Sequence, residues 1–176
     1  MSIQKMLMIA AAVTIIFVQE QILLIAPNVQ FTVLLIILFS TIFTFKESTV
    51  MIVVYVILDS LYMGALNPFY MTPMLIAWMI IPMMYHTVLR RTNNEYILAV
   101  FALFFGFVYG WVFIPFRMIQ YGVNIAWPYL LADIPFEIIM AIVGFGTVLV
   151  GFKPLKKVLD QIITKEIYTV KKAKID

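Results

Sequence analysis

The chain has 176 residues, of which 64% are hydrophobic and only 12% are charged. A soluble domain carries about 25% charged and about 45–50% apolar residues, so a soluble globular protein and a disordered chain are both excluded. We therefore expect an all-α membrane protein. Six helices of ~20 residues would use up the chain, which leaves no room for a soluble catalytic domain. No cysteine is present, so disulfides, thiolate nucleophiles and Cys-based metal sites are excluded as well.

Six apolar runs predict a bundle of six transmembrane helices. Pro27-Asn28, Asn67-Pro68 and Arg90-Arg91 separate several of these runs. Residues 1–152 are expected to form one transmembrane domain. Its predicted spans are 6–24, 29–45, 48–65, 73–89, 96–116 and a sixth within 128–152.

The basic residues fall almost entirely on one side of this six-span arrangement. Of the twelve Lys and Arg residues, only Arg117 falls on the other side. Because cytoplasmic loops are rich in Lys and Arg, both termini are predicted to be cytoplasmic. The eleven residues on that side are Lys5, Lys46, Arg90, Arg91, Lys153, Lys156, Lys157, Lys165, Lys171, Lys172 and Lys174.

Residues 153–176 are predicted to form a basic cytoplasmic tail. Apolar side chains recur there at helical spacing, and the opposite face is rich in lysine. This pattern predicts an amphipathic helix on the inner leaflet, held there by anionic lipid. Docking of a partner is the alternative role. The apolar positions are Leu155, Val158, Leu159, Ile162, Ile163, Ile167 and Val170.

Ionisable residues inside the predicted spans gather in the outer half of the bundle. Such residues are costly in a membrane and usually face a cavity or a partner. Their one-sided distribution predicts a polar pocket that is open to the outside and closed below by an apolar plug. With polar residues of the outer loops, the candidate substrate-binding residues are Glu20, Asn28, Asp59, Asn67, Arg117, Asn124, Trp127, Asp133 and Glu137.

Each charged candidate also has a purely structural interpretation. Asp133 precedes Ile134-Pro135, so it could be the N-cap of the sixth helix, and Glu137 could bond a polar neighbour. Asp59 could form an ion pair with Arg117, and Arg117 could instead be an interfacial anchor. Glu20 could extend its carboxylate to the membrane interface. The tryptophans, Trp127 included, are typical of aromatic belts at the interfaces.

Small residues predict close helix contacts within the bundle. Gly106 and Gly110 form a GxxxG pair in the fifth span, and the first span has a stripe of Ala10, Ala11, Ala12 and Thr14. Small residues let neighbouring helices approach closely in membranes.

Motifs of several enzyme classes are absent from the sequence. It contains no G-x-x-x-x-G-K-[ST], no H-E-x-x-H and no G-x-S-x-G, and its single histidine is His86. We therefore expect no catalytic residues, no metal site, no cofactor and no nucleic-acid partner.

The chain resembles the substrate-binding S components of energy-coupling factor (ECF) vitamin transporters. The resemblance rests on the size, on six spans with both termini inside, and on three segments. It implies a binding domain over 1–152 that captures a vitamin or related micronutrient from outside, in a prokaryotic-type plasma membrane. The segments are Pro27-Asn28-Val29-Gln30, Asn67-Pro68 and Asp133-Ile134-Pro135-Phe136-Glu137.

The resemblance also implies partners. An S component assembles with a transmembrane T component and two cytoplasmic ATPases, which agrees with the missing phosphate-binding loop. The family docks through an A-x-x-x-A motif on its first helix, where this chain pairs Ala10 with Thr14 and Ala11 with Ile15. The implied docking residues are therefore Ala10, Ala11 and Thr14.

The ligand stays open at the level of sequence. Four candidate carboxylates against one Arg117 favour a neutral or cationic ligand over a strongly anionic one such as folate or pantothenate. A thiamine-related pyrimidine, a queuosine precursor and cobalamin all fit. The alternative from another class is a structural membrane scaffold of the rod-shape-determining MreD type, which needs no outward polar pocket.

Overall fold

The protein is all-helical, as the composition predicts. The computed structural model describes residues 2–26, 28–89 and 91–172, with side chains described up to residue 164. Within these residues there are six α-helices, one short 3-10 turn (η1) and no strand. The elements are α1 (Ile3–Ile22), α2 (Thr32–Ser40), α3 (Phe45–Tyr62), α4 (Pro68–His86), α5 (Glu95–Tyr121), η1 (Val123–Ile125) and α6 (Ala126–Lys172).

Four of the described helices, α1, α4, α5 and α6, are long and apolar enough to cross a membrane. α2 has nine residues, about 14 Å at the helical rise, against a hydrocarbon core of ~30 Å. α3 has 18 residues but carries Lys46, Glu47 and Asp59. The membrane character is therefore supported, whereas the count of six spans stays a prediction.

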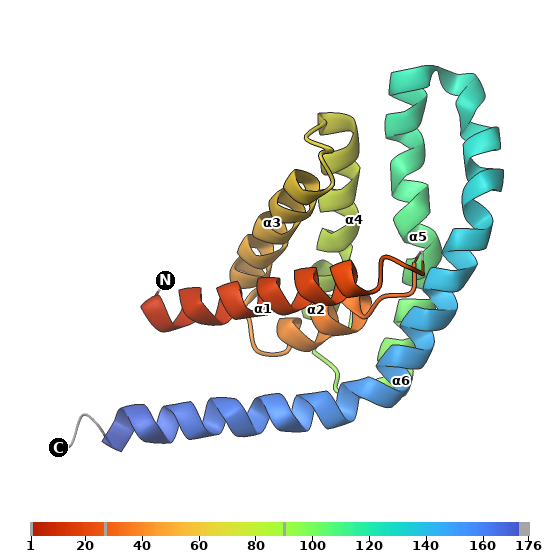
Figure 1. The fold of residues 1–176 in the computed structure, drawn as a ribbon. Coiled ribbons are helices and arrows are strands. Elements are labelled where there is room, and N and C mark those ends of the chain that lie inside the picture. Colours follow the sequence, from red (N-terminus) through yellow and green to blue (C-terminus); the bar gives the residue numbers. More distant parts are fainter. Residues whose placement is uncertain (1, 27, 90, 173–176) are drawn as a thin grey trace.

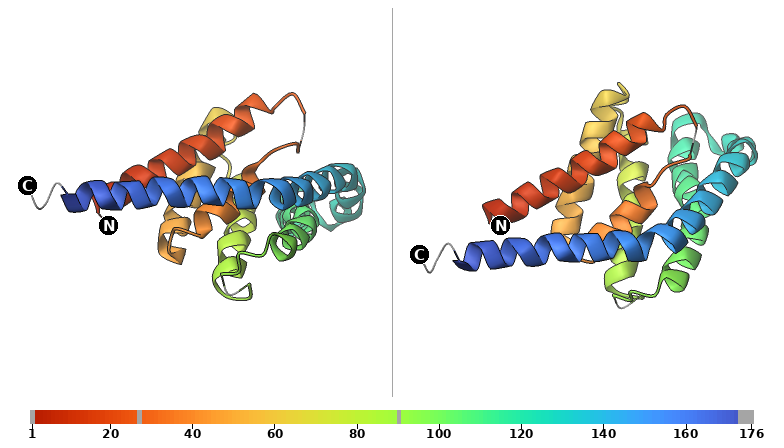
Figure 2. Two further views of the ribbon diagram at one scale, coloured as in Figure 1. Left: turned by 90° about the horizontal axis from the view of Figure 1, so that it is seen from below. Right: turned by 60° about the horizontal axis from the view of Figure 1, so that its bottom comes forward.

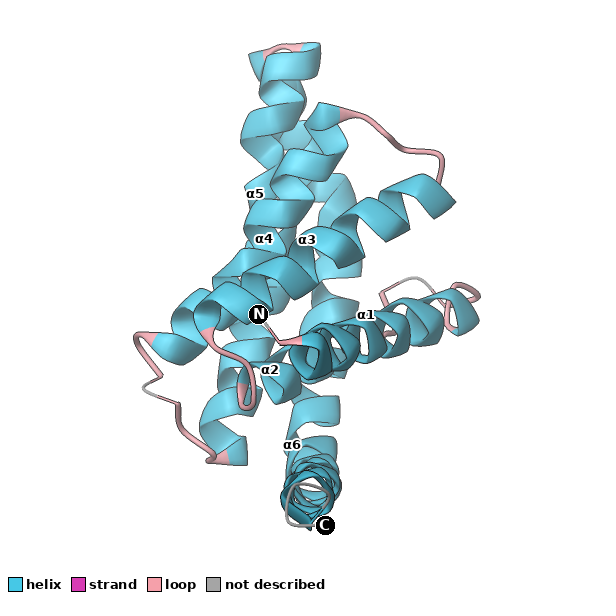
Figure 3. Cartoon of the chain, turned by 90° about the vertical axis from the view of Figure 1, so that its left-hand side faces the viewer, coloured by secondary structure: helices cyan, strands magenta, loops and turns pink. Residues whose placement is uncertain are grey.

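The helices form two sets that cross each other (Figure 1). α3, α4, α5 and the first half of α6 run steeply, and α1 and the second half of α6 run across them. α5 and α6 form an antiparallel pair that reverses at Gly122, whose φ of +92° suits glycine. Seen from the side, the second half of α6 is end-on below α1 and α2 (Figure 3). This crossing differs from the side-by-side bundle that six parallel spans would form.

α2 is the centre of the fold, because all nine of its residues are buried. The predicted span 29–45 is longer than this helix, which ends at Ser40. The hydroxyls of Ser40 and Thr41 donate to carbonyls of their own last turn. Thr44 then starts α3, and it accepts from the Glu47 backbone N–H while its own N–H donates to the Glu47 carboxylate at 2.8 Å. This bond holds the pKa of Glu47 below its usual value.

α6 is one continuous helix through the predicted domain boundary at residue 152. It contains Pro135 and Pro154, and it bends where its second half begins (Figure 1). The interpretation of Asp133 as an N-cap is therefore wrong, because the helix begins upstream at Ala126. Its far end projects past the N-terminus of α1 in both views of Figure 2.

The predicted amphipathic tail is helical as far as Lys172. Val158 and Ile162 are 52% and 53% exposed, and Leu159 packs on the core. The side chains of 165–172 and all of 173–176, which include Lys165, Ile167 and Val170, lie outside the described residues.

Candidate functional site

A cavity of about 400 Å³ lies between the end of α1, the connection that follows it, α5 and α6. Met63 and Tyr70 reach it from the end of α3 and the start of α4. Its polar walls bring together residues that are more than 100 positions apart in the chain. The polar lining residues are Glu20, Asn28, Gln30, Tyr70, Tyr109, Arg117, Tyr129, Asp133 and Glu137.

Two glycines of α5 allow α6 to approach closely. A Cβ atom on Gly106 would lie 2.5 Å from the backbone nitrogen of Ala141. A Cβ atom on Gly110 would lie 2.3 Å from Glu137 Oε1 and 2.6 Å from Asp133 Oδ2. The predicted GxxxG contact is therefore confirmed, and its second glycine leaves room for two carboxylates.

Glu137 is the most buried charged residue of the cavity wall. It is 3% exposed, and its Oε1 atom has no hydrogen-bond partner among the described residues. Asp133 lies one turn earlier on the same face of α6 and is partly buried. Neither carboxylate takes part in an ion pair within the part of the chain that the structure describes.

Arg117 is the one basic side chain among the described residues that line the cavity. Its Nη1 donates to Gln120 Oε1 at 3.3 Å, and its guanidinium lies over the Tyr129 ring at 5.6 Å from the ring centroid. The alternative ion pair with Asp59 is not formed, since neither residue belongs to an ion pair of the described residues. The guanidinium therefore contacts Gln120 and Tyr129 and forms no ion pair with the carboxylates of the wall within the described residues.

Glu20 connects the cavity to a buried polar group on α3. Its carboxylate accepts a hydrogen bond from the hydroxyl of Tyr55, which is fully buried. This inward contact contradicts the interpretation of Glu20 as a side chain that extends to the interface. Asp59 lies one turn after Tyr55, is 2% exposed and leaves Oδ1 without a partner in the described structure. Asp59 does not line the cavity.

A column of aromatic rings borders the cavity. The Trp78 and Tyr109 ring centroids are 4.9 Å apart, and those of Tyr109 and Phe113 are 5.4 Å apart. Tyr70 adds a further ring at 6.1 Å from Phe113. Trp78 is 1% exposed, so an interfacial belt does not account for it. The cavity thus combines an acidic wall on α6 with flat apolar surfaces from α4 and α5.

Asn28 holds the connection between α1 and α2 against α6. Its backbone has φ of +61°, and its side-chain Nδ2 donates to the Phe136 carbonyl at 3.0 Å. The same connection is tied to α1, because Gln19 Oε1 accepts from the Phe31 N–H and Gln19 Nε2 donates to Thr32 Oγ1. Asn28 therefore builds the cavity wall as well as lining it.

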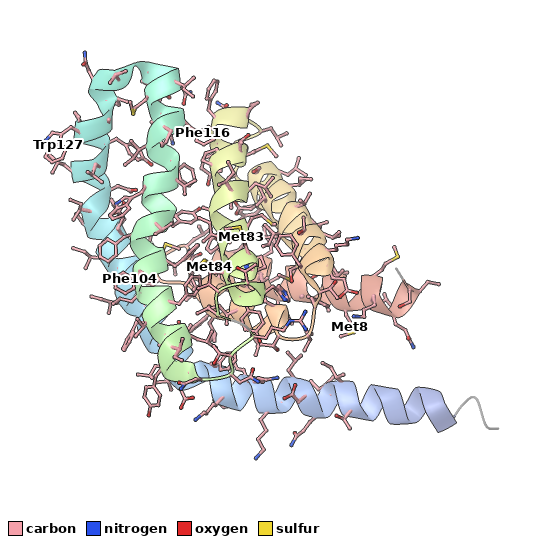
Figure 4. The ribbon with its side chains drawn as sticks, turned by 180° about the vertical axis from the view of Figure 1, so that it is seen from behind. Met8, Met83, Met84, Phe104, Phe116 and Trp127 are labelled. Atoms are coloured by element: carbon pink, nitrogen blue, oxygen red, sulfur yellow. The ribbon has the colours of Figure 1, made fainter. Side chains whose placement is uncertain are left out.

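Besides Asp59, three further predicted binding residues lie away from the cavity. Asn67 caps α4, where its Oδ1 accepts from the Phe69 N–H at 2.9 Å. Asn124 lies exposed in η1. Trp127 is 67% exposed and projects from α6 on the side away from α4 (Figure 4).

Five of the nine predicted residues therefore meet at the cavity: Glu20, Asn28, Arg117, Asp133 and Glu137. Sequence reasoning missed the lining residues Tyr70, Tyr109, Tyr129 and Gly110. Only Gly110 carried a signal, through its GxxxG spacing with Gly106. The tyrosines have no local pattern that separates cavity positions from packing positions.

The predicted docking residues lie on the open face of α1. Ala10, Ala11 and Thr14 are exposed, and Thr14 Oγ1 donates to the Ala10 carbonyl at 2.9 Å. Ala12, in contrast, is 1% exposed and belongs to the core. The face is thus available for contact with another helix.

Comparison with known proteins adds no relative: no protein-family model, curated protein or solved structure matches the chain. Among the described residues, no three His, Cys, Asp or Glu side chains are grouped so that they could hold a metal ion. The functional argument therefore depends on the cavity and its charged wall.

Proposed function

We propose that the protein is a membrane-embedded substrate-binding subunit of an ECF-type importer, and that the cavity captures a small polar micronutrient from outside. The observation that carries this proposal is Glu137, a carboxylate 3% exposed in the cavity wall with an unpartnered oxygen. Burying a polar atom without a hydrogen-bond partner lowers the free energy of unfolding by ~1–3 kcal/mol, and by more when the group is charged. A ligand with N–H or O–H groups would supply the missing bond.

The cavity favours a binder over a structural scaffold. A scaffold of the MreD type gains nothing from a polar cavity, whereas buried polar groups and a hollow with aromatic walls are typical of ligand sites. A volume of about 400 Å³ falls within the range of small-molecule pockets, ~300–1,000 Å³.

The distribution of charge supports an outward-facing cavity. Lys46 lies at the start of α3, Arg91 lies between α4 and α5, and Lys153 lies near the bend of α6. These positions are at the lower end of the steep helices in Figure 1, and the cavity involves the opposite ends of α3 and α4. By the positive-inside rule, the basic end faces the cytoplasm. In this proposal α3 also crosses a plasma membrane, the segment 29–45 that contains the buried α2 is the second of six crossings, and both termini are cytoplasmic.

Energy for uptake would come from partner subunits. The sequence has no phosphate-binding loop, so ATP hydrolysis is assigned to two cytoplasmic ATPases and coupling to a transmembrane T component. The exposed Ala10, Ala11 and Thr14 on α1 form the proposed docking face.

Mass spectrometry of small molecules released from the purified protein tests the proposal. Folded wild-type protein should release a defined small molecule in a fixed molar ratio. Glu137→Gln should lower its retention about 10- to 150-fold, which corresponds to a charged hydrogen bond of ~1.5–3 kcal/mol. Asp160→Asn is the matched control, since Asp160 is an exposed carboxylate of the same helix paired with Lys156. Release of nothing by folded protein, together with purification free of any ATPase, would favour the scaffold.

A further inference from the structure

The two carboxylates above Gly110 are close enough to hold one donor group together. Asp133 Oδ2 and Glu137 Oε1 lie 2.6 Å and 2.3 Å from the same point, the Cβ position that glycine leaves empty. The two oxygens can therefore be no farther apart than these distances combined, 4.9 Å. Charged N–H···O bonds measure about 2.7–2.9 Å, so the separation of the two oxygens is one that a single nitrogen could bridge.

Neither carboxylate of this pair forms an ion pair within the described residues. Arg117, the one basic lining residue among those described, is engaged with Gln120 and Tyr129 instead. Glu20 adds a third carboxylate to the walls. Two ionised carboxylates this close would repel each other, and a bound cation would lower that repulsion. An anionic ligand would add to it.

The remaining walls suit a flat ring. Tyr70, Tyr109 and Phe113 line the cavity and belong to one column of aromatic contacts. Aromatic faces attract both flat rings and organic cations. Ligand shape and ligand charge are thus set by different helices, the former by α4 and α5 and the latter by α6.

We infer that the cavity selects small organic cations that carry an N–H-rich group on a flat ring, with that group bridging Asp133 and Glu137 above Gly110. The inference rests on the proposed function, since it names the ligand class of the same cavity. A metal ion is not the occupant that this geometry favours, because no group of three His, Cys, Asp or Glu ligands is present among the described residues.

Three probes of nearly equal shape test the charge preference: benzamidinium, benzamide and benzoate. Ligand-observed NMR and thermal stability are measured on the purified full chain in detergent. Benzamidinium should bind at least about 10-fold more tightly than benzamide, as expected for a charged hydrogen bond, and benzoate should be the weakest. Glu137→Gln should remove most of the benzamidinium advantage and leave benzamide nearly unchanged. Asp160→Asn should change none of the three.

Several results would overturn the inference. These are equal or tighter binding of benzamide or benzoate, equal weakening of all three probes by Glu137→Gln, or no binding of any probe to folded wild-type protein. If Glu137→Gln does not fold, Asp133→Asn takes its place. The outcome is separable from that of the proposed function: release of a neutral or anionic small molecule by the wild-type protein would refute the cation preference and keep the binding function.

Discussion

Gly110 of α5 lies directly against the Glu137 carboxylate of α6, so closely that a Cβ atom there would be 2.3 Å from Oε1. One turn earlier, Gly106 lies against the backbone of Ala141 in the same helix pair. The two glycines share one motif but touch different parts of α6. Gly106 brings the helices together, and Gly110 makes room for charged side chains.

Alanine substitutions should separate these two roles. Gly106→Ala meets backbone atoms, which cannot move aside, and should destabilise the helix pair by ~1–3 kcal/mol as overpacking does. Gly110→Ala meets the ends of two side chains, so the fold should be retained. The displaced carboxylates should nevertheless lower benzamidinium binding at least about 10-fold. Unfolding in detergent and NMR titration measure the two effects, and the reverse pattern would contradict the assignment.

Asn28 should be sensitive to both its backbone and its side chain. Asn28→Ala removes the hydrogen bond to the Phe136 carbonyl, which contributes ~0.5–1.5 kcal/mol to stability. It also forces alanine into a left-handed backbone conformation, which costs a further ~1–2 kcal/mol of stability. Asn28→Gly removes only the bond. Hydrogen exchange of the amides in 23–31 should therefore accelerate more in the alanine variant than in the glycine variant. Equal acceleration would mean that the backbone conformation contributes nothing.

Single cysteines should report the orientation, since the chain has none of its own. Leu66 is 61% exposed between α3 and α4, and Asn93 is exposed between α4 and α5. In intact cells an impermeant thiol reagent should label Leu66→Cys and should reach Asn93→Cys only after permeabilisation. Labelling in the opposite order would invert the proposed topology.

The open face of α1 should be required for assembly and not for binding. Ala10→Trp adds a bulky ring to an exposed position, so it should abolish copurification with the T component and ATPases while benzamidinium binding is retained. Ile142→Trp is the matched control, because Ile142 is 63% exposed on α6 and outside the proposed face. Assembly that survives Ala10→Trp would show that docking uses another surface.

The amino-acid sequence alone was sufficient for the features that depend on composition and on local caps. The low content of charge predicts a membrane protein, and apolar runs bounded by Asn67-Pro68 or by basic residues predict most helices to within a few residues. The predicted third span begins at 48, and the structure starts α3 slightly earlier, at Phe45, where Thr44 and Glu47 form a capping box. The polar and charged residues of the outer half also predicted five residues that meet at the cavity, three of them carboxylates.

Tertiary structure alone decided which helix crosses which and what each carboxylate touches. Nothing local distinguishes the nine buried residues of α2 from part of a longer span, because burial by five neighbouring helices is a property of packing. In the same way, the Tyr55 bond to Glu20 and the Gly110 contact with Glu137 join residues from different helices. Periodicity along one helix carries no information about such contacts, since they depend on the crossing and register of two helices.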